Sequence, residues 1–328
     1  RRRLPRSVCA GDLLVVELEL ANHRSRGGCW ALVVEESFSH EKDRQACSSA
    51  KIYIPFLPAG GRQTASYRGR LTERGRYQMA PVRLSTRFPF GLFRHSIQLG
   101  QTEQLVVYPR IGRLTQRWTA RQQQAFEGAQ RREQHSGRAE GDFYGVRPWR
   151  TGDSQRWIHW RASARHQSLV VRQFEQYRNR DLAVLLDLWQ PTESGPQDQE
   201  HVEWAVSFAA ALIAQACRKG VNRLGLAIVG QQGVWLTGPA STGLLDDALE
   251  HLALAQPSAE DSLSKVLDPL AQTFRKGAEI VVIRAYPAGP TETSLPERKP
   301  QLLRRLAGAQ ILWVDVTDPQ FTDYFLPP

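Results

Sequence analysis

The sequence predicts a protein of two domains, an antiparallel β-sandwich followed by an α/β domain with a doubly wound, mostly parallel sheet. The first observation is length, because 328 residues exceed what one small core normally holds. The second observation is a change in the pattern of apolar residues along the chain. Short alternating segments fill residues 1–110, whereas apolar strands alternate with helical segments from residue 181 onward. A polar segment, 111–141, separates the two patterns.

The first part is composed of short segments with alternating apolar and polar residues, bounded by turn residues. The Arg74-Gly75 pair lies inside one long alternating segment, which predicts a hairpin centred there. No long helical pattern interrupts the series, so about seven antiparallel strands are expected. The predicted strand segments are 13–20, 29–36, 51–58, 64–87 with its hairpin, 88–99 and 103–109.

The middle segment, 111–141, is rich in glutamine and arginine and has no sustained apolar stripe. Such composition predicts a basic linker, part of it helical, between domains. The α/β domain is then expected over residues 142–328. Its predicted strands are 181–189, 223–230, 233–238, 278–286 and 309–317, and its helices 200–220, 242–256 and 259–277.

The two parts differ in charge. Residues 1–180 carry a net charge of +17 and residues 181–328 a net charge of −7. A basic part can bind nucleic acid, anionic lipid or an acidic protein face, although arginine can also simply cover a solvated surface. In parallel α/β sheets, the functional crevice is expected at the carboxyl ends of the strands.

The chain starts with three arginines and its only methionine is Met79, so the first residue is not a natural translation start. Arginines at such an edge are typical of the cytoplasmic flank of a membrane helix, and also of a tag remnant or a solvated terminus. The chain itself has no apolar run of about 18 residues, the length that spans a bilayer. Four cysteines without C-x-x-C spacing argue against a zinc or redox site and favour a reducing compartment.

Asp187 closes the first buried strand of the α/β part, which resembles the von Willebrand factor A fold. In that fold an Asp-x-Ser-x-Ser run at this place binds a metal ion. Here Trp189 and Pro191 replace both hydroxyl ligands, and Arg284 ends a later strand where its charge would repel a cation. We therefore predict a degenerate site that binds no metal, with Asp187 capping a helix or pairing with an arginine. No motif for a nucleotide or another cofactor follows any strand.

The segment 145–165, "GVRPWRTGDSQRWIHWRASAR", concentrates the candidate site residues. Ser163 lies within helical reach of His159 and His166, which would suit a hydrolase, but no G-x-S-x-G motif surrounds it. Trp149, Trp157 and Trp160 could stack on bases in a nucleic-acid site. However, Trp157, Trp160 and Ala164 share one helical face, which predicts packing against the sheet.

A structural interpretation explains more of this segment. Gly152 and Asp153 form a loop-to-helix junction, with Asp153 as the N-cap of a helix that begins at residue 154. Arg156 then lies near the cap carboxylate and is expected to pair with it or with another acid. Two adjacent strands should follow over residues 168–187, with Glu175 on the first. Arg150, Arg161 and Arg165 remain outside as a basic docking ridge.

The run from residue 141 to 175 resembles the signature of the bacterial domain-of-unknown-function 58 family. An upstream run that ends in "FPFGLF" and "VVYP" is similar to a second pattern of the family, with Phe88 in place of its usual aspartate. The signature positions matched here are Gly145, Arg147, Trp149, Gly152, Asp153, Arg156, Ile158, Trp160, Ser163, Ala164, Arg165 and Glu175.

The resemblance implies a pair of membrane helices upstream, then a β-sandwich and a von Willebrand factor A-like domain on the cytoplasmic face of the bacterial inner membrane. It also implies partnership with a MoxR-type AAA+ ATPase and no established enzymatic activity. The leading hypothesis is a non-enzymatic adaptor that acts with such an ATPase, and with client proteins, in assembling or maturing other complexes, which we expect to belong to the cell envelope. The alternatives are a nucleic-acid-binding protein and, third, a hydrolase.

Overall fold

A computed structural model describes most of the chain, as two compact units. The first unit contains residues 1–112 and 245–256 together with Pro328, and the second contains residues 113–244 and 257–327. The described residues are 1–5, 7–43, 47–124, 143–151, 153–174, 181–191, 195–260, 263–274, 278–286 and 309–328. The predicted combination of an all-β part and an α/β part is confirmed.

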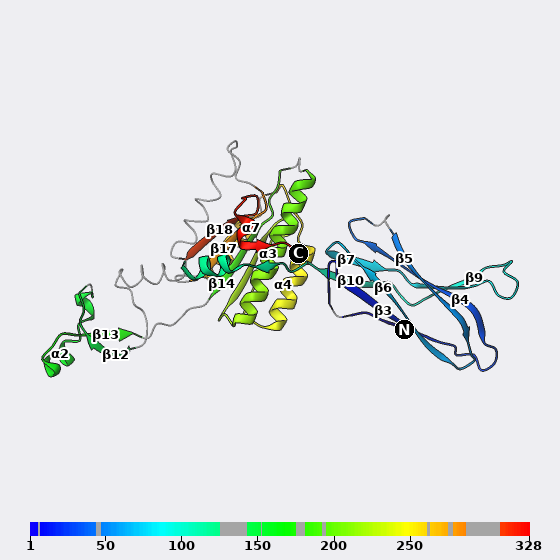
Figure 1. Cartoon of the computed structure of the whole chain (residues 1–328), viewed down its shortest axis with the longest axis horizontal. Helices are drawn as coiled ribbons and strands as arrows, with labels where there is room; N and C mark the ends of the chain where they lie inside the picture. Colours follow the sequence, from blue (N-terminus) through cyan, green and yellow to red (C-terminus); the bar gives the residue numbers. More distant parts are fainter. Residues whose placement is uncertain are drawn as a thin grey trace. The chain divides into compact units, whose positions relative to one another are not determined.

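The first unit is built from two β-sheets (Figure 1). The smaller sheet has the order β1-β3-β6, and the larger has the order β2-β10-β7-β4-β8-β9, with β5 paired to β4. All of these pairs are antiparallel except the short pair of β2 with β10. The strands are β1 Arg2–Arg3, β2 Val8–Cys9, β3 Leu13–Ala21, β4 Cys29–His40, β5 Cys47–Leu57, β6 Arg62–Arg70, β7 Gly75–Met79, β8 Val82–Thr86, β9 His95–Leu99 and β10 Glu103–Tyr108.

The core of this unit follows from side-chain alternation along the strands. In β3, Leu14, Val16 and Leu18 are buried, whereas Leu13 and Val15 face solvent, because successive side chains leave a strand on opposite faces. The inward residues pack against buried residues of the larger sheet, which include Val34, Ile54, Met79 and Val107. The period-two pattern in the sequence therefore fixes which face of each strand is inside.

The predicted hairpin at Arg74-Gly75 is wrong. β6 pairs with β3 in the smaller sheet, whereas β7 pairs with β4 and β10 in the larger one, so the connection between them crosses from sheet to sheet. Gly75 begins β7 with φ of 135°, and a Cβ there would collide with the ring of His40. The glycine serves this close approach and not a hairpin turn.

The arginine-rich start of the chain is partly internal. The Arg2 guanidinium donates to Glu36 Oε1 at 2.6 Å and to the Ala80 carbonyl at 2.8 Å, and both charged side chains are almost fully buried. Burial and the neighbouring Glu36 carboxylate raise the pKa of Tyr67, which lies beside this pair. Arg2 is thus part of the interior of the sandwich, in contrast to the solvated terminus considered above.

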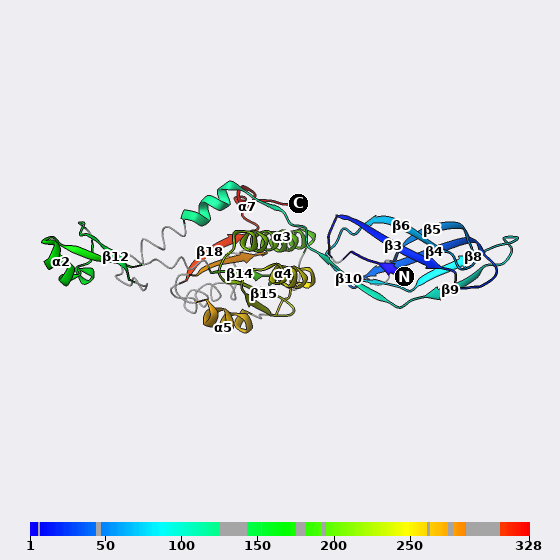
Figure 2. The same cartoon turned by 90° about the horizontal axis from the view of Figure 1, so that it is seen from below.

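The second unit contains a five-stranded sheet in the order β16-β15-β14-β17-β18. β14, β15, β17 and β18 are parallel, and β16 is an antiparallel edge strand. Every residue of β14 and β15 is buried, because α3 and α5 cover opposite faces of the sheet (Figure 2). The elements are β14 Leu182–Asp187, α3 Pro196–Lys219, β15 Leu224–Val229, β16 Val234–Gly238, α5 Leu263–Thr273, β17 Glu279–Arg284, β18 Gln310–Asp315 and α7 Phe321–Tyr324. The helix α4 (Thr242–Leu254) begins in this unit, but its residues from Leu245 onward belong to the first unit.

The first residues of the expected linker belong to the second unit. β11 (Arg113–Leu114) pairs with β19 (Phe325–Leu326), and residues 116–124 are helical. Trp118, in this helical stretch, is fully buried and packs edge-to-face on Phe208 and Tyr324. The rest of the predicted linker, 125–141, lies outside the described residues.

No helix in the described part of the chain is long and apolar enough to cross a membrane.

Candidate functional site

The signature segment forms a small substructure, which we call the signature lobe (residues 143–174). β12 (Phe143–Pro148) and β13 (Val170–Phe174) pair antiparallel, and the helix α2 (Trp160–His166) lies next to them (Figure 1). On its other side β13 is held by Ile158, which bridges to Val171, and by the His159 amide, which donates to the Val170 carbonyl at 2.9 Å. β13 is therefore the centre of the lobe. The prediction that this strand lies beside the following strand of the sheet is wrong, because its partner is β12.

The predicted helix from residue 154, capped by Asp153, is also wrong. A single 3-10 turn spans Gln155–Trp157, and the buried Ile158 is extended, with φ of −61° and ψ of 123°. The α-helix starts only at Trp160, where His159 is the N-cap and its Nδ1 accepts from the Ala162 amide at 3.1 Å. The pairing of Ile158 with Val171 breaks the helix, because an extended residue cannot continue one.

Asp153 instead closes the turn before the 3-10 segment. Arg147 donates to both of its carboxylate oxygens at 2.7 Å, and the Arg150 amide donates to Asp153 Oδ2 at 2.8 Å. This bidentate contact lowers the pKa of Asp153 and raises the pKa of Arg147, since each charge stabilises the other. The expected partner of Asp153 was Arg156, so this pairing is corrected. Gly152, which precedes Asp153 in the sequence, lies outside the described residues.

Ser163 is the buried side chain of α2, and its hydroxyl has main-chain partners. Its Oγ accepts from the Val170 amide at 3.0 Å and lies 3.4 Å from the Val170 carbonyl, to which it donates. These bonds join α2 to β13. Both the donor and the acceptor of the hydroxyl are thus used in holding the lobe together.

The tryptophans of the segment differ in exposure. Trp149 and Trp157 are half-buried, whereas Trp160 is 68% exposed and Ala164 is exposed beside it. The prediction that Trp160 packs inward is therefore wrong. The helix is shorter than expected and turns Ser163 inward, so that its Trp160–Ala164 face points to solvent.

Exposed arginines accompany Trp160 on the lobe. They are Arg150, Arg156, Arg161 and Arg165. The lobe therefore combines an internal ion pair, Arg147–Asp153, with a solvent-facing set of one tryptophan and four guanidinium groups, which we call the basic face. Glu175, the remaining predicted site residue, lies outside the described residues.

Asp187 lies at the carboxyl end of β14, as predicted, and is buried. Its Oδ1 accepts from the Trp189 amide at 3.2 Å, so it holds the turn after the strand. Arg284 lies beside it in the sheet register and forms an ion pair with Asp315 at 3.3 Å. Across the described ranges, no three His, Cys, Asp or Glu side chains are grouped so that they could hold a metal ion.

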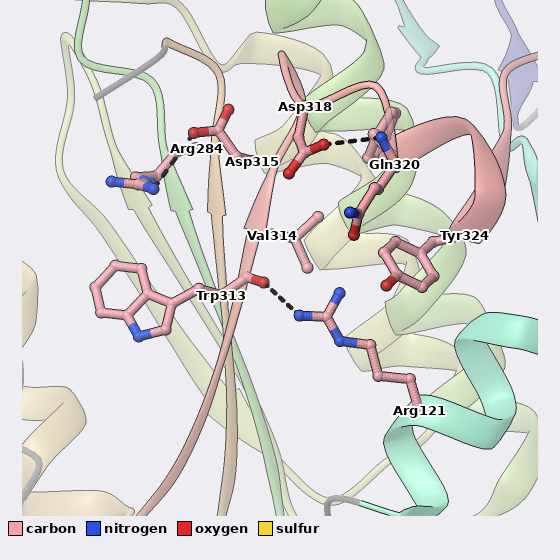
Figure 3. Close-up of a pocket in the computed structure, with 9 residues that line it drawn as sticks. Arg121, Arg284, Trp313, Val314, Asp315, Asp318, Gln320 and Tyr324 are labelled. Atoms are coloured by element: carbon pink, nitrogen blue, oxygen red, sulfur yellow. Dashed lines mark hydrogen bonds and ion pairs between the residues drawn. The ribbon is translucent and has the colours of Figure 1, made fainter. Parts of the chain in front are cut away.

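A polar pocket of about 260 Å³ lies by the carboxyl ends of β17 and β18 (Figure 3). The Arg121 guanidinium donates to the Trp313 carbonyl at 3.1 Å and lies over the Tyr324 ring, and Arg284 lies over the Trp313 ring. Sequence analysis missed Arg121, which falls in the predicted linker. The only signal was the general rule that crevices form where parallel strands end. Its two cationic groups already have protein partners, so the pocket defines no ligand.

The protein thus belongs to a class that combines an all-β part, an α/β part and the signature lobe. Comparison with known families identifies this class. A family profile described as "Protein of unknown function DUF58" matches residues 145–325, more than half of the chain. The chain belongs to this family.

A curated relative is the Uncharacterized protein YeaD of Bacillus subtilis (strain 168), which is 24% identical over 243 residues. The match covers 74% of this chain and 58% of the relative, so the chain spans little more than half of that protein's length.

Solved structures give only weak similarity. The alkylpurine DNA glycosylase AlkC of Pseudomonas fluorescens, bound to DNA with an abasic site analog, matches with a TM-score of 0.23 and 13% identity, over 32% of this chain and 29% of that chain. The β-glucuronidase 2 of Bacteroides uniformis, in a calcium-binding mutant, matches with a TM-score of 0.25 and 12% identity, over 96% and 27%. Neither likeness carries an argument about fold or function.

Proposed function

We propose that this protein is a non-enzymatic interaction module that docks an acidic face of a MoxR-type AAA+ ATPase through the basic face of the signature lobe. In this proposal the module is tethered by upstream helices to the cytoplasmic side of the bacterial membrane. It acts with the ATPase in assembling or maturing other complexes of the cell envelope. The observation that carries the proposal is the exposure of Trp160 among Arg150, Arg156, Arg161 and Arg165.

The different contacts of the lobe residues support docking. Arg147, Asp153 and Ser163 make internal contacts that fix the lobe, whereas Trp160 and the four arginines are exposed. Tryptophan and arginine are the residues most enriched among those that dominate binding energy at protein interfaces. Guanidinium groups in addition form bidentate contacts with carboxylates, which favours an acidic partner surface.

We also propose that the second unit is von Willebrand factor A-like. The strand order β16-β15-β14-β17-β18, with one antiparallel edge strand, supports this likeness. With Trp189 and Pro191 in place of hydroxyl ligands, the proposed interaction needs no metal at Asp187.

The decisive experiment is a pull-down of the cognate ATPase by the whole chain and by the variants Arg156→Glu, Arg165→Glu and Trp160→Ala. We expect each variant to lose most of the ATPase signal and to keep its melting temperature, because these side chains are exposed. Arg68→Glu is the matched control, since Arg68 is an exposed arginine of β6 in the first unit. Unfolding of the three variants, or unchanged binding, would disprove the site.

Nucleic-acid binding is the second candidate, and the exposure of Trp160 favours it more than the sequence did. An exposed aromatic ring among arginines can stack on a base while guanidinium groups contact phosphates. A fluorescence-anisotropy titration with single-stranded RNA and DNA tests it. Binding at micromolar protein that weakens as salt rises would support this candidate, and its absence would remove it.

A further inference from the structure

The connection between β8 and β9 presents large apolar side chains to solvent. Phe90, Leu92 and Phe93 are 83%, 78% and 86% exposed, and Phe88 is 54% exposed. All residues from 87 to 100 are exposed, including the whole of β9. Figure 2 shows β8 and β9 side by side at one end of the sandwich, with their connection projecting from it. We call this connection, residues 87–94, the aromatic tip.

Aromatic residues of neighbouring strands extend the tip. The Trp30 ring, 49% exposed at the start of β4, stacks on Phe88 with centroids 5.8 Å apart and contacts Phe56 at 4.2 Å. Thr86 fixes the base of the tip, because its hydroxyl donates to the Trp30 carbonyl at 2.8 Å and accepts from the Phe88 amide at 3.2 Å. An apolar surface thus reaches from β4 and β5 of the larger sheet to the tip.

Positive charge surrounds this apolar surface. The loops at this end of the sandwich, residues 22–28, 58–62 and 86–95, contain five arginines and no aspartate or glutamate. The arginines are Arg24, Arg26, Arg62, Arg87 and Arg94, and all of them are exposed. Two have acidic neighbours behind the loops, since Arg62 lies 3.7 Å from Glu19 and Arg94 lies 3.6 Å from Glu35.

We propose that the aromatic tip inserts into the surface of a membrane that contains anionic phospholipid. Phenylalanine and leucine would enter the acyl boundary, Trp30 would lie at the level of the headgroups, and the arginines would contact lipid phosphates. The shape favours a membrane over a protein partner. The apolar side chains project from a hairpin end, whereas a protein partner is usually anchored in a pocket, and the surrounding charge has one sign.

The inference goes beyond the proposed docking of an ATPase, because it concerns another unit and does not depend on that partner.

Co-sedimentation of the whole chain with lipid vesicles tests the proposal. We expect binding to vesicles of phosphatidylglycerol mixed with phosphatidylcholine and little binding to pure phosphatidylcholine. The double variant Phe90→Ser/Phe93→Ser should lose about tenfold or more in affinity, because it removes two aromatic side chains from the acyl boundary. Leu13→Ser is the matched control, since Leu13 is 53% exposed at the opposite end of β3.

A second variant, Arg87→Gln/Arg94→Gln, tests the charge without touching the apolar side chains. We expect a loss of about fivefold per arginine, which disappears at high salt. Equal binding to both kinds of vesicle, or unchanged binding by both double variants, would overturn the proposal. So would self-association without vesicles that the Phe90→Ser/Phe93→Ser variant abolishes, because the tip would then be an interface between two copies of the chain.

Discussion

Ser163 shows how one side chain holds the signature lobe together. Its hydroxyl contacts both the amide and the carbonyl of Val170, in a buried position. Ser163→Ala should destabilise the lobe by about 1–3 kcal/mol, because it leaves the buried Val170 amide without its acceptor. Hydrogen exchange at the Val170 amide measures this directly. An exchange rate equal to that of the unmodified chain would show that the hydroxyl has no structural role.

The ion pair of Arg147 with Asp153 gives the lobe a pH dependence. Since the pKa of Asp153 is lowered in the folded state, its contribution to stability is present above the unfolded value, near 4, and is lost as pH falls through the lower folded value. Asp153→Asn should therefore speed exchange of the Arg150 amide at pH 7 and make little difference in strong acid. An effect that is equal at both pH values would contradict this assignment.

Glu279, at the start of β17, gives stability the opposite dependence on pH, because its pKa is raised in the folded state. Burial raises its pKa to about 7, although Gln122, which donates to its Oε2 at 3.2 Å, and Lys219 lower it. The folded state thus binds the proton more tightly than the unfolded state, and stability falls as pH rises from about 4.5 to about 7.

Replacement of this carboxyl by an amide should remove that loss. We expect Glu279→Gln to stabilise the protein by roughly 1–3 kcal/mol at pH 8 and to change little at pH 5. Thermal melting at the two pH values provides the comparison. A variant that is destabilised at pH 8 would show that the ionised carboxylate is the favoured form.

Among the elements, the helical stretch 116–124 contributes to the core although the sequence predicts a linker there. Trp118→Ala should cost about 3–5 kcal/mol, since it empties a fully buried site against Phe208 and Tyr324. Urea unfolding of the whole chain measures the loss. Arg117→Ala is the control, because the neighbouring side chain is exposed and its ion pair with Asp323 is a surface contact.

The elements also show where prediction from sequence succeeds. The continuous apolar run of β14 and the alternation of β3 are set by burial on two faces or on one, and both were predicted within a residue or two. The start of α2 was not, because the pairing of Ile158 with Val171 decides it, and that contact joins residues 13 positions apart. Trp118 likewise lies in a polar stretch, so no periodic pattern marks it as core.

The candidate site was also predicted in part, because local patterns identify its residues but not the contacts between them. The residues of the signature were found from their types and spacing, but their partners were not. Arg147 and Arg156 are equally good donors to Asp153 in the sequence, and in the structure Arg147, near the end of β12, is the one that contacts the carboxylate. The exposure of Trp160 depends in turn on the later start of the helix.

At the scale of the whole molecule, we propose two contacts, that of the basic face with an ATPase and that of the aromatic tip with a membrane. Both contacts are electrostatic in part, but they differ in how much apolar surface they bury. Because the basic face relies on arginines around a single tryptophan, ATPase capture should weaken by about tenfold or more as salt rises from low to moderate ionic strength. Vesicle binding should weaken less, since the aromatic tip adds several buried side chains. Titrations of both partners over one salt series give the comparison, and parallel salt curves would contradict it.

The tryptophans lie in different environments, so their intrinsic fluorescence can distinguish events in different parts of the chain. Trp160 is exposed on the lobe, Trp118 is fully buried in the second unit, and Trp30 is half-exposed beside the aromatic tip. Indole emission shifts to the blue when water leaves the ring, so a variant that keeps only one of the nine tryptophans, chosen from these three, would report on one event. Docking would shift the emission of Trp160, lipid contact that of Trp30, and unfolding would shift that of Trp118 to the red.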